Sequence, residues 1–271
     1  MRRSIAAFAV VCGALLAAAG PAAAEPAWAP AATAPVHPGV QTDTAGGQCT
    51  ANFVFFDAAD SVYIGQAAHC SGTDGNTATD GCIAGTLPHG TPVGVDGATR
   101  PGTIVYSSWV TMQAGGETDA NTCRYNDFAL IRLDPADYGR VNPTIPFWGG
   151  PTGTATTTAQ GDKVLSYGNS SLRLGITQLS PKEGISLGTA GGGWTHRVYT
   201  VSPGIPGDSG SAFIDREGRA FGVLSTLQLA PLAGANGVSD LSRMIAYMES
   251  HGGPDVTLAH GTEPFRGPIL P

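Results

Sequence analysis

The stretch at residues 207–211, with the sequence GDSGS, could place a nucleophile. A serine hydroxyl is a poor nucleophile until a neighbouring base removes its proton, so Ser209 requires a partner such as histidine. The backbone must also direct N–H groups at the oxygen that becomes negative. Gly207 suits this task because a side chain there would crowd a substrate, so the N–H groups of Gly207 and Ser209 are the expected oxyanion-binding donors. Taken alone, the pentapeptide could also be a glycine-rich surface turn.

A second stretch, QAAHC at residues 66–70, follows a strand-like segment and could supply the base. A histidine held between a strand end and a disulfide can keep one tautomer and one orientation, which general-base chemistry requires. A lone histidine is more often structural. However, His69 differs in its surroundings from the other histidines, which are His37, His89, His196, His251 and His260.

A third stretch, YNDFALI at residues 125–131, places Asp127 at the start of an apolar strand-like run. A carboxylate there can accept a hydrogen bond from the imidazole and stabilise the imidazolium that forms. Three other aspartates lie closer to His69 in the sequence, but in loop-like segments; they are Asp57, Asp60 and Asp74. We therefore expect Asp127 to complete a nucleophilic triad with His69 and Ser209.

Residues 184–188 (GISLG) form a competing motif, because G-x-S-x-G also marks the nucleophile elbow of α/β-hydrolases. That elbow requires a helix directly after the serine. The residues that follow are TAGGG, which do not favour a helix, and the chain lacks the alternation of strands and helices that such a fold needs. We therefore reject the elbow interpretation.

The elements that must position these residues are predicted to be short strands. Several β-type runs are separated by Gly, Asp and Asn; they cover residues 52–56, 61–65, 103–112, 127–133, 163–167, 196–201, 211–214 and 220–226. This texture is typical of an all-β sandwich or barrel pair. One helix is predicted at residues 239–251, with Ser239 or Asp240 as its cap and apolar residues at helical spacing.

The two ends of the 271-residue chain differ from its middle. Two arginines, an apolar run and the sequence AAA at residues 22–24 predict a signal peptide over residues 1–24, and Cys12 lies within it. Its roughly 15 apolar residues are too few for a membrane span. Residues 25–46 are rich in Ala and Pro and are interpreted as a linker or short pro-segment, and residues 253–271 as a solvated C-terminal tail. We expect a secreted, extracellular protein that is not held in a membrane.

Composition narrows the possible partners and cofactors. The formal net charge of −7 argues against nucleic acid, which usually binds a clustered basic face. The four remaining cysteines favour two disulfides and allow three pairings; they are Cys49, Cys70, Cys82 and Cys123. No metal-binding cluster or nucleotide-binding loop is apparent, so we expect no metal and no cofactor.

The AAHC, NDFALI and GDSGS motifs, in this order, resemble the chymotrypsin/trypsin superfamily of serine proteases, in its secreted bacterial branch. The resemblance covers about residues 47–252. It implies two antiparallel six-stranded β-barrels with the triad in the cleft between them, a C-terminal helix behind, and a monomer that cuts protein or peptide substrates. It also implies a disulfide between Cys49 and Cys70, which leaves Cys82 and Cys123 for the second.

The sequence departs from this family's pattern at its activation switch. Many animal members bury a new N-terminus, of the IVGG type, against the aspartate before the nucleophile. Asp208 is present, but no such sequence precedes Cys49. Some bacterial relatives use an internal arginine instead, and Arg173 is the candidate here, because a buried unpaired carboxylate would cost several kcal/mol.

The residues of the expected specificity pocket also depart from the pattern of this family. The position where trypsin-like members carry an aspartate is Pro203, so a preference for Arg or Lys is not expected. Ser225 and Gly237 are also assigned to the pocket. Leu227 stands where glycine is usual and would narrow the space, which predicts small or medium apolar side chains next to the cut bond.

Two other functions use the same residues. A catalytically idle domain could bind a partner, although such a module has no need of an intact triad and oxyanion glycine. An esterase or acyl-transferase could use the same triad, because the acyl-transfer chemistry is shared.

Overall fold

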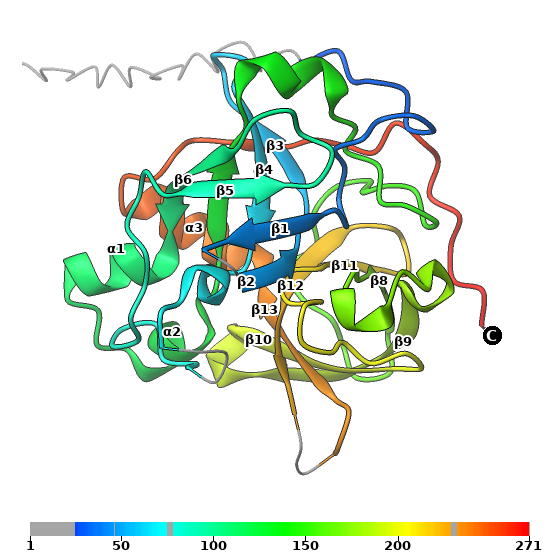
Figure 1. Ribbon diagram of the computed structural model, residues 1–271. Helices are drawn as coiled ribbons and strands as arrows, with labels where there is room; N and C mark the ends of the chain where they lie inside the picture. Colours follow the sequence, from blue (N-terminus) through cyan, green and yellow to red (C-terminus); the bar gives the residue numbers. More distant parts are fainter. Residues whose placement is uncertain (1–24, 46, 75–77, 229–231, 271) are drawn as a thin grey trace, which may run out of the picture.

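The computed structural model describes residues 25–270, apart from residues 46, 75–77 and 229–231. The predicted signal peptide and Cys12 lie outside this part of the chain. The described chain is mostly β and has two halves, a curled sheet and a closed barrel, whose facing sides meet along the middle of the molecule (Figure 1). No helix in the described part is long and apolar enough to cross a lipid bilayer.

The first half is an eight-stranded sheet with the strand order β14-β3-β4-β7-β6-β5-β1-β2. Every recorded pairing in it is antiparallel. Its strands are β1 (Gln41–Thr44), β2 (Gly47–Thr50), β3 (Val54–Phe56), β4 (Val62–Gln66), β5 (Pro92–Val95), β6 (Gly102–Ser107), β7 (Ala129–Arg132) and β14 (Thr257–Leu258).

The second half is a closed barrel with the strand order β10-β13-β12-β11-β8-β9. Register shifts in β10, β11 and β12 mark irregularities of the kind that let a sheet bend and close. Its strands are β8 (Lys163–Tyr167), β9 (Pro181–Ala190), β10 (Thr195–Thr200), β11 (Ala212–Asp215), β12 (Ala220–Leu227) and β13 (Asn236–Asp240).

The expectation of two closed barrels is therefore met only in the second half, since the recorded strand pairs among the described residues leave the first sheet open. At the end of β2, the N–H of Thr50 donates to the carbonyl of Ser209 in the other half, at 2.8 Å. The chain then passes through residues 51–53 into β3. The covalent chain thus joins the end strand β2 to β3, next to the other end of the sheet, and the sheet curls without a complete ladder of hydrogen bonds.

The predicted C-terminal helix is confirmed as α3 (Leu241–Ser250). The Asp240 side chain caps it by accepting from the N–H of Arg243 at 2.9 Å. The segment predicted as one strand at residues 103–112 is instead β6 followed by α1 (Ser108–Gly115). A left-handed Gly116, with φ of 64°, ends α1, and α2 (Ala120–Tyr125) follows it.

Five short 3-10 helices connect the strands of the described chain. They are η1 (Ala68–Ser71), η2 (Pro135–Arg140), η3 (Ser171–Arg173), η4 (Thr177–Leu179) and η5 (Gly191–Gly193). Of these, η1 carries His69 and η3 carries Arg173, so both contribute to the region described below.

Both terminal segments pack against the body of the molecule, which differs from the linker and solvated tail expected from composition. Val36 and Val40 are buried, and β1 belongs to the sheet. At the other end, β14 pairs with β3, and the last described residues run beside the closed barrel (Figure 1). There the Glu183 carboxylate accepts from the N–H groups of Ile269 and Leu270. Because these contacts involve short strands and single residues, periodic patterning does not reveal them.

Candidate active site

A cleft of about 600 Å³ runs between the two halves and brings the three predicted triad residues together. His69 and Asp127 belong to the first half, and Ser209 belongs to the second. The first half also contributes wall residues from β2 and from the loops after η1, and the second half contributes residues 204–207 and the end of β12.

His69 lines this cleft from η1, which follows β4. Its Nδ1 lies 2.7 Å from Oδ2 of Asp127, and its own main-chain N–H donates to Oδ1 at 2.9 Å. An ionised carboxylate only accepts hydrogen bonds, so Nδ1 carries the hydrogen and Nε2 keeps a lone pair. The Cys49–Cys70 disulfide fixes the residue after His69 to β2. The ring is therefore held in one tautomer, with a basic nitrogen available.

Asp127 lies just before β7 and is 4% exposed. Besides its two contacts with His69, it accepts a hydrogen bond from the Ser225 hydroxyl at 2.5 Å. Burial alone would raise the pKa of this carboxyl, but the charge of His69 and the hydrogen bonds from His69 and Ser225 outweigh burial and lower it. Asp127 is thus ionised at neutral pH and suited to stabilise an imidazolium.

The same contact acts on His69 in the opposite direction. Burial would lower the pKa of the imidazole, but attraction to Asp127 and the hydrogen bond to it prevail and raise the pKa above its ordinary value of 6.5. A base with a pKa near the operating pH can both take up and return a proton during one reaction cycle.

Ser209 lies in a tight turn whose main chain is anchored to the first half. The Gly207 carbonyl accepts from Gln48 Nε2 at 2.9 Å and from the Thr50 hydroxyl at 2.8 Å. Gly207 has φ of 92°, and a Cβ there would meet Gln48 and Ser170. Glycine is therefore needed for the backbone conformation and for this close approach, in addition to the access for substrate that we expected.

Asp208 points away from the cleft into the protein and is fully buried. Its carboxylate accepts from the N–H of Ser170 at 2.9 Å and from that of Ile205 at 3.1 Å. Arg173, the internal partner expected from the resemblance, forms an ion pair with it at 2.7 Å. Lys182 forms a second ion pair with the same oxygen at 3.0 Å, which nothing in the local sequence predicts.

The residues assigned to the specificity pocket divide into two groups. Ser225 and Leu227 line the cleft, as does the end of the turn at residues 204–206. Pro203 and Gly237 do not belong to its described lining; the Pro203 carbonyl accepts from Arg173 instead, at 2.9 Å.

Asn236 lines the cleft and was missed by sequence reasoning. Its side chain accepts from the N–H of Gly204 at 2.8 Å and donates to the carbonyls of Gly204 and Thr226. It therefore ties together two walls of the pocket. No sequence signal identifies this residue, because its partners Gly204 and Thr226 belong to other segments of the chain.

The competing motif at residues 184–188 lies within β9, and its serine is unsuited to nucleophilic attack. Ser186 is fully buried, and its hydroxyl lies 2.9 Å from that of Thr158. Since the motif forms part of a strand rather than a strand-turn-helix elbow, the structure agrees with the sequence argument against it.

A second histidine–aspartate pair occurs inside the barrel, where Nε2 of His196 lies 2.8 Å from Oδ2 of Asp240. The sequence showed no such partner for His196. This imidazole is fully buried, its Nδ1 lies 3.0 Å from the Thr158 hydroxyl, and it is not part of the cleft lining. Both ring nitrogens thus have hydrogen-bond partners inside the protein, and we assign this pair a structural role.

Both disulfides that the resemblance implied, Cys49–Cys70 and Cys82–Cys123, are present. Among the described residues, the groups of His, Cys, Asp and Glu close enough to bind a metal together both contain a disulfide. A sulfur bonded to another sulfur is not a thiolate ligand, so these groups lack the donors of a metal site.

Comparison with known proteins connects this geometry to a fold. No protein-family model matches the chain, and no curated protein sequence matches it. Among solved structures, Thermobifida fusca protease A is similar with a TM-score of 0.52 and 16% identity, over 83% of this chain and 99% of that chain. The Nocardiopsis protease gives a TM-score of 0.51 and 16% identity, over 82% of this chain and 98% of that one.

A serine protease specific for glutamic acid is also similar, with a TM-score of 0.50 and 15% identity, over 83% of this chain and all (100%) of that one. At such low identity these likenesses establish the fold alone. The chain therefore has the fold of the bacterial chymotrypsin-like serine proteases.

Proposed function

We propose that this protein is a secreted serine endopeptidase that works through His69, Asp127 and Ser209. The observation that carries the proposal is the contact of 2.7 Å between His69 and Asp127, in the same cleft as Ser209. The fold shared with serine proteases makes peptide-bond hydrolysis the most direct use of this cleft. Because each half supplies part of the triad, a substrate bound between the halves would meet Ser209 and His69, while Asp127 supports His69 from behind.

The chemistry follows from the roles of these atoms. The Ser209 hydroxyl attacks the carbonyl carbon of the peptide bond while Nε2 of His69 takes up the hydroxyl proton. The carbonyl oxygen becomes negative and accepts hydrogen bonds from the N–H groups of Gly207 and Ser209. The C–N bond then breaks, His69 gives its proton to the leaving amine, and an acyl-enzyme ester remains on Ser209. Water repeats these steps and releases the acid.

We infer a preference for small or medium apolar side chains next to the cut bond. Leu224, Leu227 and Ile205 line the same cleft as Ser209, and Leu227 is 39% exposed. The one acid in the described lining, Asp127, is already bound to His69 and Ser225. A basic substrate side chain therefore lacks a free anionic partner there. The assignment of Pro203 and Gly237 to the pocket stays a proposal.

Secretion is proposed from the predicted signal peptide at residues 1–24 together with the two disulfides, which persist in oxidising compartments. The mature protein is proposed to act as a monomer on protein or peptide substrates, without nucleic acid, membrane or cofactor. Removal of residues 25–46 as a pro-segment is a separate proposal. N-terminal sequencing of protein from the culture medium tests both cleavage sites, after residue 24 and after residue 46.

Hydrolysis of a peptide library by protein purified without residues 1–24 tests the proposed activity. Cleavage after small or medium apolar residues, lost in Ser209→Ala and in His69→Ala, is the expected result. Dominant cleavage after Arg, Lys or large aromatic residues would contradict the inferred specificity. Rapid hydrolysis of simple esters with no cleavage of any peptide would favour the esterase interpretation, and inactivity on both would favour a binding domain.

A further inference from the structure

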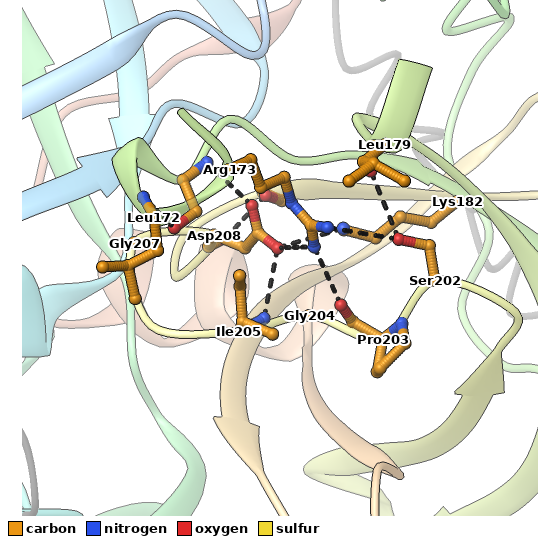
Figure 2. Close-up of polar contacts among 12 residues, drawn as sticks. Leu172, Arg173, Leu179, Lys182, Ser202, Pro203, Gly204, Ile205, Gly207 and Asp208 are labelled. Atoms are coloured by element: carbon orange, nitrogen blue, oxygen red, sulfur yellow. Dashed lines mark hydrogen bonds and ion pairs between the residues drawn. The ribbon is translucent and has the colours of Figure 1, made fainter. Parts of the chain in front are cut away.

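The carboxylate next to the proposed nucleophile is bound by two cations rather than one. Oδ2 of Asp208 lies 2.7 Å from the Arg173 guanidinium and 3.0 Å from Nζ of Lys182 (Figure 2). The side chains of Asp208 and Lys182 are fully buried, and that of Arg173 is 9% exposed. Gly168 leaves room for this arrangement, because a Cβ there would collide with both Asp208 and Lys182.

The two cations reach Asp208 from elements of different kinds. Arg173 comes from η3, whose neighbouring residues Leu172 and Leu174 are 64% and 88% exposed. Lys182 comes from β9, a strand paired on both sides in the closed barrel. The lysine thus connects Asp208 to the barrel wall, whereas the arginine connects it to a surface loop.

Stability alone does not account for two cations at this position. One carboxylate and one cation already form a neutral pair, and a second buried cation leaves an excess positive charge away from water, which is costly. The pKa of Lys182 reflects this cost: burial, the largest influence, and repulsion from Arg173 lower it, and together they outweigh the charge and hydrogen bond of Asp208, which raise it. Asp208 and Arg173 are the charged groups that act on Lys182 in the described chain. An arrangement that is costly for folding points to a role in function.

We propose that Lys182 is a positioning residue, which holds Asp208 against the barrel and thereby keeps the N–H groups of Gly207 and Ser209 directed at the oxyanion. This inference rests on the proposed protease activity. Asp208 lies between these two residues in the chain, so a shift of its carboxylate moves both donors. Because Lys182 lies on strand β9, it supports the turn at residues 207–209 rigidly, without a newly formed N-terminus.

The variants Lys182→Met and Lys182→Arg test this role. Methionine leaves a neutral pair of Arg173 and Asp208 in an apolar setting, so the free energy of unfolding should stay equal or rise. At the same time kcat should fall by about tenfold, less than the roughly 10²–10³ lost with a whole oxyanion donor. KM should change by less than about twofold, because the oxyanion donors bind the transition state more strongly than the bound substrate. Arginine, which keeps the charge, should restore kcat to within about threefold of the wild type.

The pH profile gives an independent readout. As Lys182 loses its proton at alkaline pH, wild-type kcat should decline toward the value of Lys182→Met, and Lys182→Arg should show no such decline. Lys163→Met is the matched control, because Lys163 lies on the adjacent strand β8 and donates to the carbonyl of Leu270. This variant should keep the kcat and the alkaline decline of the wild type.

Wild-type kcat in Lys182→Met would overturn the proposal, as would a parallel loss of kcat and stability that arginine does not rescue. Either result would overturn only the role of Lys182, because the wild-type protein would still hydrolyse peptides. Failure of the wild-type protein to hydrolyse any peptide would overturn the proposed function, and the positioning role with it.

Discussion

The main-chain N–H of Thr50 donates to the carbonyl oxygen of Ser209 at 2.8 Å, across the boundary between the two halves. The Thr50 hydroxyl also donates to the carbonyl of Gly207 at 2.8 Å. The turn that carries the proposed nucleophile is therefore bound to the first sheet on one side and, through Asp208, to the barrel on the other. Its geometry therefore depends on residues outside the proposed triad.

Gln48 provides one test of this dependence. It donates to the carbonyl of Gly207 at 2.9 Å and accepts from the N–H of Ser171 at 3.0 Å. Gln48→Ala should lower kcat by about 3- to 10-fold, since a lost hydrogen bond is worth about 1 kcal/mol. Gln41→Ala is the control, because Gln41 donates to Asn169 outside the cleft lining. Equal kcat values for the two variants would contradict the anchoring role.

Asp127→Asn should lower kcat by roughly 10⁴, because the amide no longer fixes the tautomer of His69 or stabilises the imidazolium. Steady-state hydrolysis of the best peptide substrate measures the loss. Asp57→Asn serves as the control. Asp57 lies nearer to His69 in the sequence, but it is a loop residue whose carboxylate accepts a hydrogen bond from the Tyr63 hydroxyl. A similar loss in both variants would show that Asp127 has no special role.

The raised pKa of His69 predicts how activity changes with pH. A general base must be neutral, so kcat/KM should rise with pH through the raised pKa, with a midpoint above 6.5. Asp127→Asn removes the attraction, so its midpoint should lie lower. The stability effect has the opposite sign: protonated His69 stabilises the folded state at low pH, and this contribution is lost as pH rises through the folded-state pKa. A wild-type midpoint below that of Asp127→Asn would refute this assignment.

Leu227 and Asn236 should set the size of the accepted side chain. Leu227→Gly and Asn236→Gly should each raise kcat/KM for phenylalanine relative to alanine next to the cut bond, by about tenfold or more, as pocket volume is worth about 1–3 kcal/mol per methylene. Leu174→Gly is the control, because Leu174 is 88% exposed and lies outside the cleft lining. Unchanged preference in both pocket variants would place the specificity determinants elsewhere.

The parts of the molecule predicted from sequence are those that depend on local patterns. The helix α3 follows from helical spacing, and of the two caps that the sequence allowed, Ser239 and Asp240, the structure uses Asp240. The proposed roles of His69 and Ser209 come from local motifs, whereas that of Asp127 depends on the whole pattern. The pairing of the disulfides depended on the family resemblance, because four cysteines alone leave three possibilities.

The parts that could not be predicted depend on contacts between distant segments. Gln48 and Gly207 are 159 residues apart in the chain, and nothing in either neighbourhood indicates the other. Lys182 belongs to none of the motifs in the sequence, and its partner becomes visible only when β9 is placed beside the turn. The open first sheet and the packed terminal segments were missed for the same reason, since short strands and single hydrogen bonds leave no periodic pattern.

Covalent labelling of the wild-type protein with a fluorophosphonate is the most direct test of the central claim that Ser209 is a nucleophile activated by His69. The serine oxygen should displace fluoride from phosphorus, and mass spectrometry should locate the adduct on Ser209. His69→Ala should abolish labelling while circular dichroism and the free energy of unfolding show an intact fold. Absence of any adduct on the folded wild-type protein, or an adduct on another serine such as Ser186, would contradict the account.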